Sequence, residues 1–148
     1  MRHLFTALLL SAVLSGYSQL SSHISIQEAN KALDVLADAK RKDLDSLRQV
    51  CDTLIKVYKT VELPCQEIRA QAFKARFLKR DLDYEEASKC ILQAKRLFEK
   101  SSCGNEVLAE IYRSQIDVYL KLTDFEKVDS LCWLTINMFE PNWTSKKV

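Results

Sequence analysis

The chain has 148 residues, of which 47% are hydrophobic and 28% are charged, a composition typical of a single globular domain with its own apolar core. Only 2 glycines and 2 prolines are present, so the sequence encodes few strand boundaries and an all-α fold is expected. The 22 basic and 20 acidic residues are interspersed and leave a formal net charge of +2. This balance gives no bulk electrostatic argument for a nucleic-acid partner or an anionic membrane.

The first 18 residues have the pattern of a secretory signal peptide. A short basic start precedes an apolar run over residues 4–14, and Gly16 and Ser18 offer small side chains for a cleavage site. The run is too short to span a bilayer, and a buried N-terminal helix would be amphipathic, which this run is not. We expect cleavage, export to the periplasm or the exterior, and no stable membrane insertion. Residues 19–25 then form a polar lead-in.

The first predicted hairpin covers residues 26–61. Ser25 and Glu28 have the Ser-x-x-Glu spacing of a capping box, in which the two side chains satisfy free backbone amides at the start of a helix. Asp43 or Asp45 is expected to cap the second helix. Apolar residues recur at intervals of three and four in both helices, which indicates one inward stripe on each.

The second predicted hairpin covers residues 64–100. Pro64 suits the first turn of a helix because its missing amide would have no partner there. Asp83 stands in the turn before the second helix of the hairpin. Residues 101–105 are the clearest loop in the sequence, and Gly104 is expected to take the positive φ that ends a helix.

The third predicted hairpin covers residues 105–140, with Asp124 as the cap of its second helix and Pro141 at its end. Residues 142–148 form a polar tail. Repeat arrays usually close with a polar capping helix. None follows here, so we expect the outer face of the last helix to be apolar and to be covered by Trp143 or by a second copy of the chain.

The three hairpins share one register. The turn aspartates Asp43, Asp83 and Asp124 recur at spacings of 40 and 41 residues, and the inward positions of the second helices then coincide. These aligned positions are Leu47, Ala87 and Val128; Cys51, Ile91 and Cys132; and Leu54, Ala94 and Thr135. All but Thr135 are small or apolar, as the interface between stacked hairpins requires. The period predicts a stacked helical repeat.

These residues resemble the tetratricopeptide repeat (TPR) family, whose motif has an aromatic residue after a turn Asp, two small residues seven apart, and Pro at the repeat end. The matching residues are Asp83, Tyr84, Ala87 and Ala94 in the second unit and Tyr119, Asp124, Phe125 and Pro141 in the third. The period is longer than the usual 34 residues, and Val128 and Thr135 replace the two alanines. The resemblance covers roughly residues 33–141. It implies an α-α superhelix of about three antiparallel hairpins that binds a protein or peptide on its concave face.

The resemblance also places partner-binding residues on the first helix of each hairpin. In the second hairpin these are Arg69, Phe73, Arg76, Lys79 and Arg80. Four cations around one aromatic ring could hold an acidic peptide or a C-terminal carboxylate. The alternative is a solvated charged face that pairs with Glu67, Asp81 and Asp83. In the third hairpin the corresponding positions are mixed in sign, namely Glu110, Arg113, Ser114, Asp117 and Lys121, which suits a polar peptide.

The chain has 5 cysteines, an odd number, in an expected compartment that permits disulfides. Cys65 and Cys103 lie just before the first helices of adjacent hairpins, in equivalent loops, and are the candidate disulfide; the alternative is two unpaired surface thiols. Cys51 and Cys132 hold the inward repeat position and are expected to be core thiols. Cys90 has no role that the pattern assigns.

The sequence contains no catalytic signature. It lacks a Cys-x-x-Cys pair, a His-Glu-x-x-His motif, a Gly-rich phosphate loop and a Gly-x-Ser-x-Gly elbow. His23 is the only histidine after the predicted signal peptide, so a nucleophilic cysteine has no histidine partner in the folded region. We expect no enzymatic activity, no cofactor and no metal.

The leading hypothesis is therefore an exported TPR-like scaffold that binds a protein or peptide and not nucleic acid. One alternative is a periplasmic sensor or accessory module of a membrane signalling system. A second alternative is a small secreted helical bundle that binds an apolar ligand. A weak homodimer through the last helix is a further hypothesis.

Overall fold

The computed structural model describes residues 24–37 and 43–139, and this part of the chain is entirely helical. Its helices are α2 (Ile26–Ala37), α3 (Leu44–Thr60), α4 (Pro64–Arg80), α5 (Tyr84–Phe98), α6 (Asn105–Lys121) and α7 (Phe125–Phe139). The expectation of an all-α fold is confirmed. The predicted signal peptide, most of the lead-in and the tail with Trp143 lie outside the described residues. Among the helices that are described, none combines the length and the apolar character that crossing a membrane requires.

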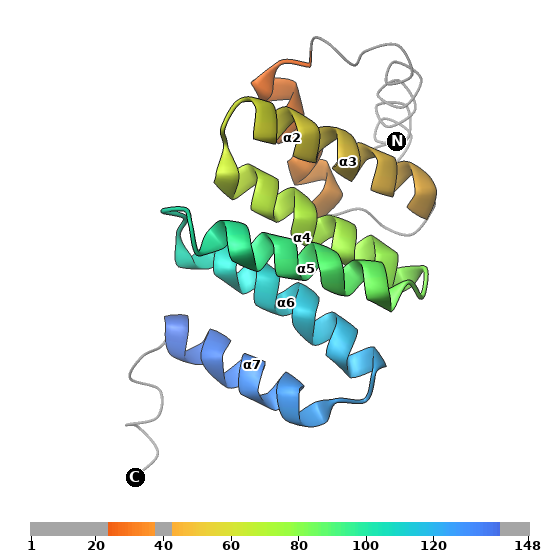
Figure 1. Ribbon diagram of the computed structural model, residues 1–148, viewed down its shortest axis with the longest axis vertical. Coiled ribbons are helices and arrows are strands. Elements are labelled where there is room, and N and C mark those ends of the chain that lie inside the picture. The colour runs from red at the N-terminus through yellow and green to blue at the C-terminus, as the bar shows by residue number, and fades with distance from the viewer. Residues whose placement is uncertain (1–23, 38–42, 140–148) are drawn as a thin grey trace, which may run out of the picture.

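The helices follow one another along the molecule, from α2 and α3 at one end to α7 at the other (Figure 1). Each helix packs against the next, and α4 in addition contacts α2 and α6. As a result α4 is the central element, with eight buried residues. At the far end α7 has a single buried residue, Leu131.

Four of the six described helices, α2, α3, α5 and α7, begin at a capping side chain, as the sequence predicts. The amide of Glu28 donates to Ser25 Oγ at 3.2 Å, and the amide of Ser25 donates to Glu28 Oε2 at 3.1 Å, which completes the predicted capping box. The hydrogen bond from Ser25 also lowers the pKa of Glu28. Pro64 is the first residue of α4, as expected.

The three turn aspartates cap the second helices of the hairpins. Asp43, Asp83 and Asp124 each accept a hydrogen bond from the backbone amide three residues on, at 3.1, 3.2 and 3.3 Å. These bonds satisfy a donor that the helix itself leaves unpaired. All three aspartates are therefore helix N-caps, and Asp43 rather than Asp45 is the cap of α3.

Three helices end in the same turn, and none of the three turns contains glycine. After α3, α4 and α6 the chain reverses through a residue with positive φ: Glu62 (56°), Leu82 (65°) and Thr123 (58°). The following amide then donates to the carbonyl five residues back, at 2.9 to 3.0 Å, in the pairs Leu63–Tyr58, Asp83–Leu78 and Asp124–Tyr119. This pattern is a Schellman motif. In two of the turns the same aspartate closes one helix and caps the next.

The expectation of a positive φ at Gly104 was wrong. Gly104 has φ −75° and ψ 169° and is the N-cap of α6. The helix before it already ends at Phe98, so the chain has left α5 well before it reaches the glycine. An extended backbone at a helix N-cap is open to most residues, and it does not draw on the conformational freedom of glycine.

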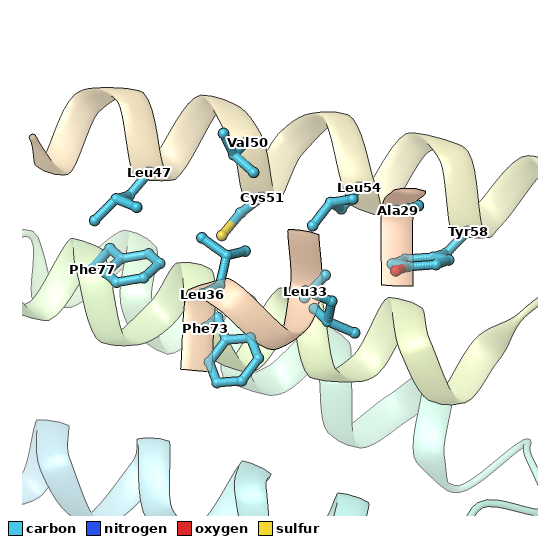
Figure 2. Close-up of a cluster of buried hydrophobic side chains, with 11 residues drawn as sticks. Ala29, Leu33, Leu36, Leu47, Val50, Cys51, Leu54, Tyr58, Phe73 and Phe77 are labelled. Carbon is cyan, nitrogen blue, oxygen red and sulfur yellow. The ribbon is translucent and has the colours of Figure 1, made fainter. Parts of the chain in front are cut away.

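Two apolar clusters form the core, and α4 contributes to both. The first lies between α2, α3 and α4 and is drawn in Figure 2. Leu33, Leu54 and Tyr58 are among its most buried members. The hydroxyl of Tyr58 donates to Asn30 Oδ1 at 3.1 Å and so ties α3 to α2. A buried hydroxyl needs such an acceptor to offset its desolvation.

The second cluster lies between α4, α5 and α6. Its members include Ile68 from α4, Ile91 and Ala94 from α5, and Ile111 and Val118 from α6. The small side chain at Ala94 is fully buried, which lets a neighbouring helix approach closely. No residue of α7 belongs to either cluster.

The positions that the predicted register aligns are buried in α3 and α5 but only half-buried in α7. Cys51, as expected, is a buried core thiol, and its burial raises its pKa. Cys132, expected at the same inward position, is only half-buried. Val128 and Thr135 are half-buried as well. The reason is that α7 has α6 on one side and no described helix on the other.

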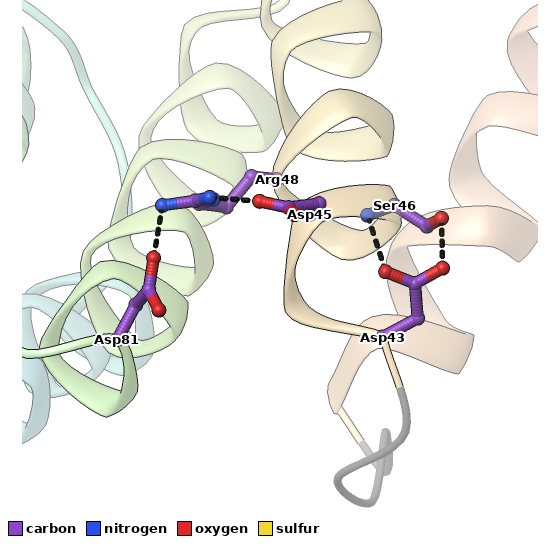
Figure 3. A network of polar contacts seen from close by, with 5 residues as sticks. All are labelled: Asp43, Asp45, Ser46, Arg48 and Asp81. Atoms are coloured by element: carbon purple, nitrogen blue, oxygen red, sulfur yellow. Dashed lines mark hydrogen bonds and ion pairs between the residues drawn. The ribbon is translucent and has the colours of Figure 1, made fainter.

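An ion pair fixes the start of α3 to the end of α4. Arg48 donates from Nη1 to Asp81 Oδ2 at 2.7 Å and from Nη2 to Asp45 (Figure 3). Lys74 and Asp52 make a second cross-helix pair at 2.7 Å. Both pairs are partly exposed, so each stabilises the packing only modestly.

Candidate functional site

A small cavity lies between α4 and α6 and unites three of the residues predicted to bind a partner. Its volume is about 70 Å³, and its lining residues are Ala37, Ala72, Phe73, Arg76, Glu110, Arg113 and Ser114. Phe73, Arg76 and Arg113 were predicted from the sequence. Because α4 and α6 are the first helices of adjacent predicted hairpins, their contact brings together residues about 40 positions apart.

The two helices approach closely at the back of the cavity, where both present small side chains. Ser114 is 1% exposed, and its hydroxyl contacts two backbone carbonyls, that of Ala72 at 3.1 Å and that of Glu110 at 3.0 Å. The hydroxyl is thus held by the backbone and faces no base that could activate it. Its role is to join α6 to α4.

The sequence predicted that Phe73 stands on an open binding surface, and the structure shows that it does not. Phe73 is 3% exposed and packs in the first core cluster. It also lines the cavity. Side chains of α2 and α3 pack against the ring, so this aromatic residue is covered. Arg76 lies over the ring, with its guanidinium carbon 5.6 Å from the centroid, a geometry in which ring and cation attract.

Three cations of α4, Arg69, Arg76 and Lys79, are paired with carboxylates of α6. Arg69 Nε lies 3.2 Å from Glu110 Oε1. Arg76 Nε and Lys79 Nζ each lie 3.9 Å from an oxygen of Asp117. The alternative of local pairing with Glu67, Asp81 and Asp83 is therefore wrong for these three cations. Asp81 instead pairs with Arg48.

Positive charge remains in excess around the cavity. Arg76 is largely buried, and burial together with the nearby charge of Arg113 lowers its pKa. Arg113 is exposed and makes no ion pair with any residue in the described part of the chain. Two carboxylates, Glu110 and Asp117, thus face the cations Arg69, Arg76, Lys79 and Arg113. A ligand with a negative charge would relieve the repulsion between the two arginines.

Arg80 belongs to the same cation group but packs on another ring, and its charge adds to the effect of burial in lowering the pKa of Arg76. Its guanidinium carbon is 5.6 Å from the centroid of Phe77, and it does not line the cavity. Phe77 belongs to the first core cluster. Arg76 and Arg80, which the sequence grouped, therefore pack on different rings, and only Arg76 lines the cavity.

Sequence reasoning placed Glu110 and Ser114 on the right face but did not recognise what they contact. It missed Ala37 and Ala72 altogether. The small residues at 72 and 114 were the available signal, since helices approach closely where both carry small side chains. Within the ranges that the structure describes, no group of three or more His, Cys, Asp or Glu side chains is placed to hold a metal ion.

A disulfide joins the entrance of α4 to the loop before α6. Cys65 and Cys103, the pair suggested by the sequence, are bonded, with their Cα atoms 5.6 Å apart. The bond closes a loop that contains the whole of α5 and holds the two helices of the candidate site together at one end. The other thiols are those of Cys51 and Cys90, which are buried, and Cys132, which is half-buried.

These features define an all-α protein with a positively charged cavity between two packed helices. No family model matches the chain, and no curated protein or solved structure is significantly similar to it. The site must therefore be interpreted from its own chemistry.

Proposed function

We propose that this protein is an exported, TPR-like scaffold of three helical hairpins that binds an acidic segment of a protein or peptide against α4 and α6. It acts by binding and not by catalysis. The single observation that carries the proposal is the pair Arg76 and Arg113 at one cavity, with more cations than carboxylates around them.

The chemistry of the two arginines supports an anionic ligand. A guanidinium group can donate two parallel hydrogen bonds to a carboxylate, and these charge-assisted bonds are about twice as strong as neutral ones. Arg76 is held in place by the ring of Phe73 and by Asp117, so little of its conformational freedom remains to be lost on binding. Arg113 is exposed and can approach the same ligand from the other side.

The size of the cavity favours a side chain or chain end over a whole small molecule. Its volume of about 70 Å³ is well below the roughly 300 Å³ at which small-molecule sites begin. The size therefore supports a scaffold that takes up a side chain or a chain end at this site. A carboxylate from an extended peptide fits the space, and the rest of the peptide would lie along α4 and α6.

The test uses a fluorescent hexaglutamate peptide and two charge-matched variants. Arg113→Glu is expected to weaken binding at least about tenfold, equivalent to about 1.4 kcal/mol, because it replaces an attracting charge with a repelling one. Arg96→Glu makes the same change at an exposed position of α5 and should leave the affinity within about twofold. Fluorescence anisotropy at fixed ionic strength measures both.

Equal affinity of Arg113→Glu and the wild type would contradict the proposed site. Equal losses in both variants would show that the peptide responds to net charge alone. Circular dichroism checks that both variants keep their helix content, which is expected because both side chains are exposed.

A further inference from the structure

Asp117 of α6 is shared loosely between two cations of α4. One of its carboxylate oxygens lies 3.9 Å from Arg76 Nε, and the other lies 3.9 Å from Lys79 Nζ. Both distances exceed the roughly 2.7 to 3.2 Å of a hydrogen bond from nitrogen to oxygen. Asp117 therefore attracts both cations by charge without a hydrogen bond to either, and a carboxylate that comes closer can take its place.

Glu110, the other carboxylate at the site, is held more firmly. Both of its oxygens lie 3.2 Å from Arg69 Nε, which donates to them. The two carboxylates also differ in their effect on Arg76. Burial lowers the pKa of Arg76, and Asp117 opposes this shift more strongly than Glu110 does. In the absence of a ligand, Asp117 is thus the main counter-charge of Arg76.

Arg76 keeps hydrogen-bond donors that it does not use. Its side chain is only 16% exposed, and a guanidinium group carries five N–H donors. None of them bonds to any residue within 24–37 or 43–139. A ligand carboxylate can accept two parallel hydrogen bonds from such a group. Arg76 consequently gains more from a ligand than it loses with the distant carboxylate of Asp117.

Asp117 has another partner available on its own helix. Lys121 follows it by four residues in α6, a spacing at which an acidic residue and a later basic residue attract each other on the helix surface. Lys121 is exposed and forms no ion pair with the rest of the described chain. The side chain of Asp117 is itself 33% exposed. A displaced Asp117 carboxylate can therefore turn to Lys121 and to water.

We propose that Asp117 is a built-in competitor of the ligand for Arg76. Without a ligand its carboxylate balances Arg76 and Lys79. On binding, the carboxylate of the acidic segment takes over Arg76, and Asp117 turns away from α4. The affinity of the site is reduced by the work of separating Asp117 from the two cations. This inference rests on the proposed function and names the residue that limits its affinity.

Two substitutions at this position should change the affinity for the fluorescent hexaglutamate peptide in opposite directions. Asp117→Asn keeps the shape of the side chain and removes its charge, so it should strengthen binding by about threefold. Asp117→Glu keeps the charge and adds one methylene, which closes the gap to Arg76 and should weaken binding by about threefold. Because Asp117→Glu has the net charge of the wild type, a change in bulk charge does not account for its effect.

Asp52→Asn is the matched control. Asp52 of α3 pairs with Lys74 of α4 at 2.7 Å, so this variant removes the same charge from another ion pair of α4. Neither partner lines the cavity, and the affinity should stay within about twofold of the wild type. Fluorescence anisotropy of the full chain at fixed ionic strength measures all variants. Circular dichroism checks their helix content, which should persist because both aspartates are partly exposed.

Wild-type affinity in Asp117→Asn overturns the competitor. Equal gains in Asp117→Asn and Asp52→Asn overturn it as well, because the peptide then responds to net charge. Unchanged or tighter binding by Asp117→Glu has the same consequence. Arg113→Glu in the same assay separates the two proposals. If it weakens binding while the Asp117 variants behave as the wild type, the peptide site stands and only the competitor is overturned. If Arg113→Glu binds as the wild type does, the site itself is wrong, and the competitor with it.

Discussion

The helices α5 and α7 begin alike and end in different environments. Both have 15 residues and an aspartate cap, and they occupy the same position in adjacent predicted hairpins. Yet α5 buries four residues, among them Ile91 and Ala94, whereas α7 buries only Leu131. The difference lies in the neighbours, since α5 packs against both α4 and α6, and α7 packs against α6. In a row of helices, the number of residues that a helix buries thus depends on whether another helix packs against its far side, and not on its own sequence.

The largest expected effect concerns the disulfide that encloses α5. Replacing Cys65 and Cys103 together by serine should lower the free energy of unfolding by about 3 to 4 kcal/mol, because the unfolded chain regains the freedom of a 38-residue separation. Urea unfolding followed by circular dichroism measures the loss. Alkylation of Cys132, which lies outside this loop, serves as the control and should leave the free energy of unfolding unchanged. A loss below about 1 kcal/mol in the double variant would contradict the expectation.

The second prediction compares two isoleucines directly. Ile91→Ala in α5 should cost about 2 to 4 kcal/mol, because it leaves a cavity where the side chain was 5% exposed. Ile136→Ala in α7 removes the same atoms at 38% exposure and should cost less than about 1 kcal/mol. Urea titrations at a protein concentration that keeps the chain monomeric provide both values. Similar costs at the two sites would mean that α7 is covered within the monomer.

The smallest expected effect is a pH dependence of stability that arises from Asp124 and Lys127 at the start of α7. The hydrogen bond from Lys127 lowers the pKa of Asp124 below its ordinary value of 3.8. Because the pKa is lower in the folded state, the stabilisation is complete above the unfolded value and disappears as the pH falls through the folded one. The same contact raises the pKa of Lys127, so the stabilisation also decreases as the pH rises above the ordinary value of 10.5.

Fluorescence of Trp133, recorded in a Trp143→Phe background, follows this change in α7. The signal should shift below pH 4 before the far-UV circular dichroism does. Asp124→Asn retains an acceptor for the cap but cannot lose a charge, so the local shift should shrink. An undiminished shift in that variant would assign it to another carboxyl group.

Local chemistry made much of the fold predictable. The capping box at Ser25 and Glu28, the aspartates at 43, 83 and 124, and Pro64 each satisfy or remove a backbone amide within a few residues. These interactions act over one helical turn, so the sequence alone determined where helices begin. The same three aspartates were correctly predicted to cap helices.

The candidate site was only partly predictable because its contacts cross between helices. The sequence placed the cations of α4 on one helical stripe, and the pairing that it offered as an alternative used carboxylates near in the chain. In the structure their carboxylates, Glu110 and Asp117, come from α6. Which cation pairs with which carboxylate depends on how α4 and α6 are rotated against each other, and no local sequence pattern encodes that rotation.

The sequence by itself determined most of the helix starts and the apolar stripes of most helices, because each follows from interactions within a few residues. Only the tertiary structure decided which stripes are covered. Phe73 is buried because α2 and α3 pack over it, and Cys132 is half-exposed because the described chain places no helix beyond α7. Burial is a property of two surfaces in contact, and one helix specifies only its own.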